Sequence, residues 1–316
     1  MPENVQPVAT RRKRYERSPS QETIIGLTPT KVQILRFLAE LRFLSLPQLA
    51  KLSCPSERPD LSEKSARRHM RALFDAGLVD VLPVPRAALA PQGATNDATL
   101  LYGSAPNIYA PTKAGLELLR RAGMIGDAEE RRTVPAYGPK NGLFLAHELA
   151  VRDVRVWLEG CARSGGHEVE CWRDGEEAAI GIGRSQPPFS VRPDAWFVYR
   201  LGATVLVGLV EVDRGTERGG RRWGEKLEAY WTLFVDHKAL RGATGYVNAR
   251  VLVFCPGGRR RDQLAELIGT SAEPPLAQRF WLTDQGYVGQ PDVTLPLWKQ
   301  PGSAHMRPLV AQPERS

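Results

Sequence analysis

The chain has 316 residues, a length that predicts two domains of about 150 residues each. Hydrophobic residues make up 42% and charged residues 25%, which is the composition of a soluble globular protein. No apolar run reaches the ~20 residues that span a bilayer. The basic run at 11–14 has no apolar stretch behind it, so we expect neither a membrane segment nor a secretory signal.

The cysteines and the charge balance indicate the environment of the protein and the kind of partner that it binds. Four cysteines without CxxC spacing favour a reducing, cytoplasmic environment and argue against a structural zinc site. Lysine and arginine number 43 against 35 aspartate and glutamate residues, so the net charge is +8. This balance favours a polyanionic partner, most often nucleic acid, although a soluble protein can be basic without one.

Composition shifts along the chain predict its organisation. The first segment is polar, contains proline and carries the run RRKRYER, so we expect a disordered basic arm that is either solvated or laid along phosphates. The expected parts are the arm over 1–27, a winged-helix domain over 28–126, a linker over 127–140, a second domain over 141–285 and an irregular tail over 286–316.

The segment after the arm shows the apolar spacing of three helices. Thr28 precedes Pro29, which places a favourable N-cap before a favourable first helical residue. A short second helix has Pro47 near its start. The third helix is expected from about residue 61 to 76, with Gly77 at its C-terminal end.

Two strands should follow, one from Gly77 and one at 107–110, before a fourth helix that opens near Pro111. Three helices, a two-stranded wing and a closing helix form a winged helix-turn-helix, whose third helix enters the major groove of DNA. The alternative is a solvated arginine face on a domain that contacts proteins. The residues expected to face DNA are Ser65, Arg67, Arg68 and Arg71.

The second domain reads as helix, three strands, helix, strand, helix and strand, which predicts an α/β fold with a mixed sheet and flanking helices. Walker A, GxSxG and dinucleotide-binding glycine motifs are missing. His147 and Glu148 do not form a zinc-protease motif, because Val151 stands where the second histidine is required.

Two carboxylates fall on a predicted β-hairpin. With Gly202 and Ala203 as the central residues of its turn, Asp194 and Glu211 are opposite each other, with Cβ atoms about 4.5–5.5 Å apart. Asp213, two residues further, points to the same face. Like charges at that distance repel, which favours a bound divalent cation such as Mg²⁺. The alternative is a salt bridge to nearby basic side chains.

At these residues the chain resembles a known fold and family. A helix with an acid comes first, followed by RPD at 192–194, EVDRGTE at 211–217 and KLEAY at 226–230. This order is similar to the PD-(D/E)XK nuclease-like fold. Joined to an N-terminal winged helix, it resembles the replication-relaxation family of plasmids and other mobile elements, over roughly residues 28–285.

The resemblance implies a role in plasmid replication and DNA relaxation, with a nuclease-type centre that uses Mg²⁺ or Mn²⁺. Asp194 and Glu211 would bind the metal, with Asp213 as a further ligand. Asp213 stands where such enzymes carry lysine, so Lys226 on the next helix would take that role. Glu148 would be another ligand or would position water.

Other interpretations stay open at this point. The domain could keep the nuclease fold without catalysis, as an accessory or regulatory DNA-binding protein, and the missing strand lysine favours this. Glu148 could pair with Arg152 one helical turn away, and Lys226 could lie along its aromatic neighbours. Four arginines after the acidic strand would either contact successive DNA phosphates or belong to a solvated loop. They are Arg214, Arg218, Arg221 and Arg222.

The expected partners follow from these interpretations. They are double-stranded DNA, replication or relaxase proteins, and a second copy of the chain, because many winged-helix proteins bind two half-sites. No membrane partner is expected. The third and weakest interpretation is a winged-helix scaffold that contacts proteins only, whose binding would be almost independent of salt.

Overall fold

The computed structural model forms two compact units, one before and one after the stretch 127–141. The predicted linker and nearly all of the predicted arm lie outside the described residues, which are 27–82, 107–126, 142–183, 189–215 and 220–310.

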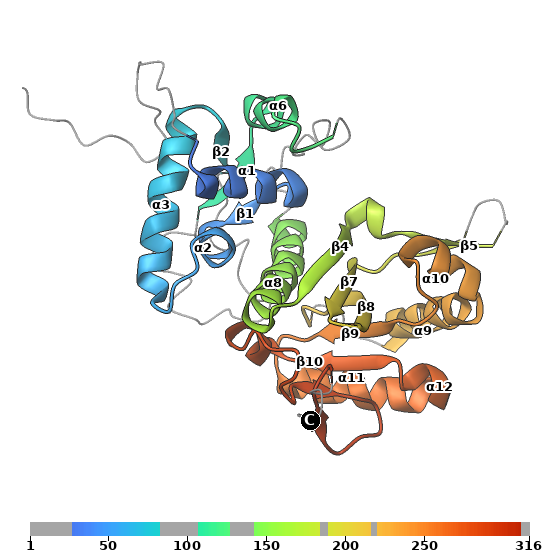
Figure 1. Cartoon of the computed structure of the whole chain (residues 1–316). Helices are drawn as coiled ribbons and strands as arrows, with labels where there is room; N and C mark the ends of the chain where they lie inside the picture. Colours follow the sequence, from blue (N-terminus) through green and yellow to red (C-terminus); the bar gives the residue numbers. More distant parts are fainter. Residues whose placement is uncertain (1–26, 83–106, 127–141, 184–188, 216–219, 311–316) are drawn as a thin grey trace, which may run out of the picture. The chain divides into compact units, whose positions relative to one another are not determined.

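The first unit combines helices with a small antiparallel sheet of order β1-β3-β2 (Figure 1). The order of elements is that of the predicted winged helix-turn-helix. The sheet has one strand more than predicted, because β1 pairs with β3. The elements are α1 (Pro29–Leu41), β1 (Leu44–Ser45), α2 (Leu46–Ser53), α3 (Pro59–Asp75), β2 (Val79–Leu82), β3 (Ile108–Pro111) and α6 (Lys113–Arg121).

Local sequence signals set the helix ends in this unit. The Thr28 side chain caps α1 by accepting a backbone hydrogen bond of 3.4 Å, and Pro29 occupies the first turn, as predicted. Ser45 and Gln48 cap α2 through reciprocal hydrogen bonds between side chain and backbone. After α3, Gly77 adopts a φ of +73°, which glycine reaches without a steric penalty.

Helix α3 begins at Pro59 rather than at residue 61. Ser62, in the first turn of the helix, is buried, and its hydroxyl donates to the carbonyl oxygens of Ala50 (3.0 Å) and Cys54 (2.6 Å). These bonds tie α3 to α2. The core of the unit includes Ile34, Leu35, Leu38, Leu49, Ala66, Met70, Leu73 and Leu119.

The second unit is built on a seven-stranded mixed sheet of order β12-β11-β10-β9-β8-β7-β4 (Figure 1). Strands β8, β9 and β10 are parallel to one another, and the other neighbouring strands are antiparallel. The strands are β4 (Glu168–Asp174), β7 (Ala195–Leu201), β8 (Thr204–Val212), β9 (Arg250–Phe254), β10 (Phe280–Thr283), β11 (Trp298–Lys299) and β12 (Met306–Arg307).

Helices cover both faces of this sheet. On one face, apolar residues of α9 and α11 share a core with alternate residues of β7 to β10. On the other face, Trp157 of α8 contacts Phe254 of β9 with ring centroids 6.3 Å apart. The remaining elements are α8 (Gly142–Gly165), η2 (Gly175–Ala178), β5 (Ile180–Ile182), β6 (Phe189–Val191), α9 (Gly220–Val235), α10 (His237–Thr244), α11 (Gly258–Ser271), α12 (Pro274–Ala277) and η3 (Gln285–Gly289). The α/β fold is therefore the one predicted.

The hairpin register is also the one predicted. Ala195 pairs with Val210 and Leu201 pairs with Thr204, with Gly202 in the turn at a φ of +54°. This register brings the residue before β7 beside the end of β8.

The expectation of an irregular tail over 286–316 is corrected by β11 and β12. Trp298 of β11 is fully buried, and its ring lies 5.4 Å from that of Phe254 and 6.0 Å from that of Trp157, between centroids. This aromatic contact anchors the tail against the sheet, so two short strands extend the sheet beyond β10. Among the helices that the structure describes, none is long and apolar enough to cross a membrane.

Candidate functional site

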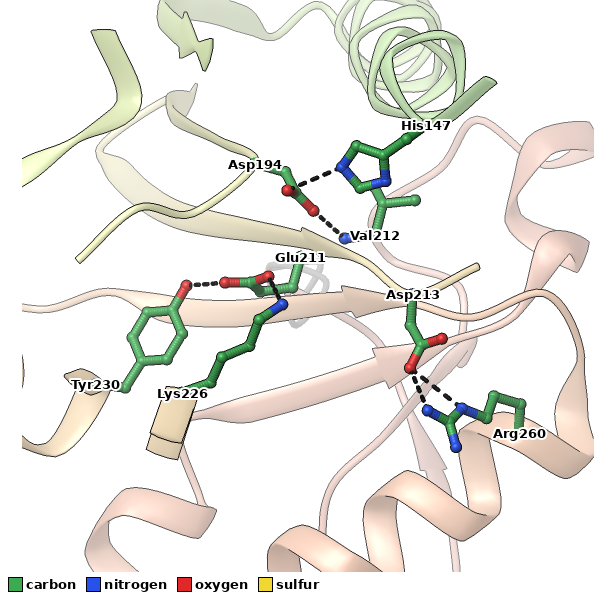
Figure 2. Close-up of polar contacts among 8 residues, drawn as sticks. All are labelled: His147, Asp194, Glu211, Val212, Asp213, Lys226, Tyr230 and Arg260. Atoms are coloured by element: carbon green, nitrogen blue, oxygen red, sulfur yellow. Dashed lines mark hydrogen bonds and ion pairs between the residues drawn. The ribbon is translucent and has the colours of Figure 1, made fainter. Parts of the chain in front are cut away.

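The hairpin fixes Asp194 at one end of the sheet, directly before β7 (Figure 2). The carboxylate Oδ2 accepts a hydrogen bond of 2.7 Å from the Val212 backbone N–H. Its Oδ1 lies 3.0 Å from Nε2 of His147 on α8, and 21% of the side chain is exposed. Asp194 is therefore held by a neighbouring strand and by a helix, and part of it stays open to solvent.

The contact between His147 and Asp194 shifts both pKa values. Burial alone would lower the pKa of His147, but the hydrogen bond and the charge of Asp194 outweigh it and raise that pKa. In Asp194, burial alone would raise the pKa, but His147, Lys226 and the Val212 N–H lower it. The pair therefore favours a protonated imidazole beside an ionised carboxylate.

Glu211 lies near the end of β8 and faces α9, with 3% of its side chain exposed. Its Oε2 accepts a hydrogen bond from Lys226 Nζ, and its Oε1 accepts one from the Tyr230 hydroxyl, both at 2.7 Å (Figure 2). Burial raises the pKa of Glu211 against the opposing effect of Lys226, and the charge of Asp194 adds to the increase. The two carboxylates are thus close enough to interact.

Helix α9 supplies both donors to Glu211. Lys226 and Tyr230 are one turn apart on the helix, so both reach the same carboxylate. The Lys226 ammonium also lies 5.1 Å from the ring centroid of Trp223, so the aromatic contact that the sequence left open is present as well. The side chain is 34% exposed, so part of it is open to solvent.

The structure thus brings together three residues that the sequence predicted and two that it did not. We call this group the acid–lysine cluster. Tyr230 stands within the KLEAY motif, and its spacing from Lys226 was the signal that could have identified it. The cluster consists of His147, Asp194, Glu211, Lys226 and Tyr230.

Asp213 points to Arg260 of α11 rather than into the cluster (Figure 2). Its carboxylate accepts hydrogen bonds from Arg260 Nε at 3.1 Å and Nη2 at 2.8 Å, and another from the Gly215 N–H. With 4% of the side chain exposed, Asp213 is neutralised by a bidentate partner. Its contacts are those of the salt-bridge alternative, formed with an arginine of α11.

Glu148 also forms the alternative contact that the sequence left open. Its Oε2 lies 2.8 Å from Nη1 of Arg152, whose Nη2 lies 3.7 Å from Asp174 Oδ2 in β4. Arg152 is fully buried, so this group links α8 to the sheet. It is the neighbour of Glu148 on the helix, His147, that contacts Asp194.

Asp194 and Glu211 provide the oxygen donors that Mg²⁺ and Mn²⁺ prefer. Within the described residues, no group of three or more His, Cys, Asp or Glu side chains could hold a metal ion. Mg²⁺ is usually bound through one or two carboxylates, and waters and substrate phosphates complete its shell. Each of the four carboxylate oxygens has one hydrogen-bond partner and keeps a second lone pair. The two residues therefore offer oxygen donors of the type that such an ion takes.

Helix α3 presents the predicted basic face. Arg67 and Arg68 are exposed, and Ser65 and Arg71 are half-buried. Arg67 and Arg71 each pair with an acid one turn away on the helix, at 4.0 Å and 3.1 Å. The amphipathic arrangement is confirmed, and contact of this face with DNA stays a prediction.

The structure describes three of the four predicted arginines after β8. Arg214 is half-buried, and burial lowers its pKa. Arg221 and Arg222 are exposed at the start of α9, and Arg221 Nε lies 3.3 Å from Glu225 Oε1. Arg218 lies outside the described residues. The three placed arginines belong to the segments that flank the acid–lysine cluster.

The order of elements in the first unit and the mixed sheet with its flanking helices define a two-unit α/β protein. The family model described as replication-relaxation matches residues 35–248, which is more than half of the chain. The chain therefore belongs to the replication-relaxation family.

Two further comparisons add little to this assignment. No curated protein matches the chain. A solved structure of the restriction endonuclease FokI is similar at 10% identity and a TM-score of 0.26, over 83% of this chain and 43% of that chain. The chain thus spans less than half of the length of that endonuclease.

Proposed function

We propose that this member of the replication-relaxation family binds duplex DNA and hydrolyses a phosphodiester bond, with Mg²⁺ or Mn²⁺ at Asp194 and Glu211. One observation carries this proposal: Lys226 reaches Glu211 at 2.7 Å, next to Asp194. A helix thereby supplies the lysine that is missing from the strand position of Asp213. Two acids and a lysine are the side chains that nuclease chemistry on this fold requires.

Each residue of the acid–lysine cluster has a task in this proposal. The ion, held by Asp194 and Glu211, would neutralise charge on the phosphate and lower the pKa of water. The Lys226 ammonium stabilises the negative charge that develops on a phosphate oxygen. Tyr230 holds Glu211 in place, and His147 holds Asp194.

The first unit would deliver the DNA. Helix α3 is the third helix of the unit, exposes Arg67 and Arg68, and buries its opposite face, as a recognition helix does in the major groove. The net charge of +8 adds long-range attraction to the phosphates. Ser65 and Arg71 would add contacts at the edge of this face, while Arg214, Arg221 and Arg222 would contact the backbone near the acid–lysine cluster.

The test is cleavage of supercoiled plasmid by the purified full chain in Mg²⁺, in Mn²⁺ and in EDTA. We expect metal-dependent nicking that is lost in the Asp194→Asn/Glu211→Gln double variant, while plasmid binding persists. Glu225→Gln is the matched control, because Glu225 lies on α9 with 64% of its side chain exposed. Nicking that continues unchanged in the double variant would refute the assignment.

A second function is supported by the paired state of the acids. Both oxygens of Glu211 already have donors, and Asp213 is held by Arg260. A nuclease fold in this state could serve as an accessory DNA-binding protein in replication initiation, relaxase recruitment or transcription control. Salt-sensitive plasmid binding without nicking in either metal, by the wild type and all variants, would favour this second function.

A further inference from the structure

A large hollow opens at the other end of the seven-stranded sheet. Its volume is about 1310 Å³, and its walls include 204–207 of β8, 248–250 at the start of β9, Trp281 of β10 and 300–303 of the tail. Strands β8 and β9 are parallel, so both begin at the end of the sheet that lies opposite Glu211. The hollow is therefore separate from the acid–lysine cluster.

Arginine is the only charged residue type among the described residues that line this hollow. These residues include no aspartate or glutamate. The uncharged polar residues among them are Thr204, Asn248, Gln278, Gln300 and Ser303, and the arginines are Arg250, Arg279 and Arg307. We call this site the arginine pocket.

The three arginines are held by uncharged groups. The Arg250 guanidinium lies 4.3 Å from the ring centroid of Trp281 and donates to the Leu309 carbonyl oxygen. Arg279 lies 4.4 Å from the ring centroid of Phe234 and donates to a backbone carbonyl oxygen at 3.4 Å. Arg307 donates to a side-chain amide oxygen at 3.2 Å. Stacking and neutral acceptors fix these side chains without cancelling their charge.

We propose that the arginine pocket binds phosphate groups, independently of any cleavage at the acid–lysine cluster. Guanidinium groups form paired, charge-assisted hydrogen bonds with phosphate oxygens. The volume exceeds the roughly 300–1,000 Å³ of a typical small-molecule site, which favours a nucleic-acid strand over a free nucleotide. Both sources carry the same phosphate chemistry, and the experiment below separates them.

The test compares two double variants that each remove two positive charges. Arg279→Gln/Arg307→Gln alters the pocket, and Lys238→Gln/Arg241→Gln alters exposed residues of α10 as the matched control. Binding of fluorescein-labelled single-stranded and duplex oligonucleotides is measured by anisotropy in EDTA, and binding of ATP and inorganic pyrophosphate by calorimetry. EDTA keeps this readout independent of metal-dependent cleavage.

We expect the pocket variant to bind oligonucleotides about tenfold more weakly or worse. The slope of log K against log salt should fall by about 2 for duplex DNA, because two phosphate contacts are lost. The control should bind like the wild type. Arginine-dependent binding of ATP or pyrophosphate alone would support the pocket with a free nucleotide as its ligand.

Equal binding of every probe by the wild type, the pocket variant and the control would overturn the proposal. Arg307 is exposed on a short edge strand, so Arg307→Gln alone should fold even if the double variant does not. The single variant is expected to show about half of the change in salt slope. Retention of the full wild-type slope by a folded Arg307→Gln protein would likewise contradict the assignment.

Discussion

The two ends of the seven-stranded sheet handle charge in opposite ways. At the end of β8, Asp194 and Glu211 each have a positive or polar donor within 3.0 Å. At the start of β8, the arginine pocket has aromatic rings and neutral oxygens as partners instead. Because β8 and β9 are parallel, both strands begin at one end of the sheet and finish at the other. A single sheet can therefore hold two sites of different charge.

Because their partners differ, the two ends should respond differently to mutation. In the acid–lysine cluster, removal of one partner leaves a buried group without its counterpart, which costs folding free energy. In the arginine pocket, removal of a guanidinium leaves neutral acceptors behind, so the main loss is positive potential. Variants at the first end should therefore change both stability and chemistry, and variants at the second end mainly binding.

The largest expected effect comes from Lys226→Met. If the proposed cleavage is present, its rate should fall about 10²–10³-fold, because the transition state loses a preorganised positive charge. Glu211 also loses a donor while it stays buried, so the free energy of unfolding should fall by about 1–3 kcal/mol. Nicking assays and urea denaturation measure the two effects, with Lys238→Gln as the control. An unchanged cleavage rate would remove Lys226 from the proposed mechanism.

Gly208→Ala should disturb both ends together. Gly208 lies within β8, and a Cβ atom added there would lie 2.4 Å from the Phe197 ring. We expect a loss of about 1–3 kcal/mol from overpacking, with weaker binding at both sites, measured by urea denaturation and by the two binding assays. Gly224→Ala on α9 is the control, because a Cβ atom added at Gly224 would meet none of the described residues within 4 Å, and this change should be neutral or slightly stabilising.

Tyr230→Phe isolates one hydrogen bond of the acid–lysine cluster. It leaves Oε1 of Glu211 buried without its hydroxyl donor, so we expect the free energy of unfolding to fall by about 1–2 kcal/mol. Phosphate binding at the arginine pocket should be unchanged. A stability equal to the wild type in urea denaturation would contradict a stabilising role for this hydrogen bond.

The smallest effect concerns the titration of His147. Its pKa should lie above 6.5, so its ion pair with Asp194 contributes stability below pH 6.5 and loses it as the pH rises through the folded-state pKa. In Asp194→Asn the remaining burial should bring the pKa of His147 below that of the wild type. NMR titration in EDTA measures both, and His69, whose pKa is lowered by burial and by Arg68 and Lys31, is the internal reference. An unchanged His147 titration in the variant would contradict the assigned contact.

Patterns among residues that are close in sequence predicted much of the fold and part of the candidate site. The hairpin register followed from the turn at Gly202 and from the two-residue period of strands, and the start of α1 followed from Thr28 and Pro29. Lys226 was found through the motif that resembles the family. Each of these features depends on neighbouring residues or on a local pattern.

The parts that were missed depend on distant contacts. Helical phase decides whether His147 or Glu148 contacts Asp194, and a shift of one residue changes the direction by about 100°. Arg260 reaches Asp213 from 47 residues away, which no local pattern indicates. Trp298 forms a strand because it packs on Trp157 and Phe254, although its sequence surroundings are rich in proline.

The order of the sheet has a consequence for synthesis of the chain on the ribosome. All five residues of the acid–lysine cluster have been translated by residue 230, whereas the arginine pocket needs 300–310 to close its wall. Before β11 pairs, β10 is an unpaired edge strand, a form that invites pairing with a neighbouring chain. The strands made after β10 therefore decide whether this edge is covered as well as whether the pocket exists.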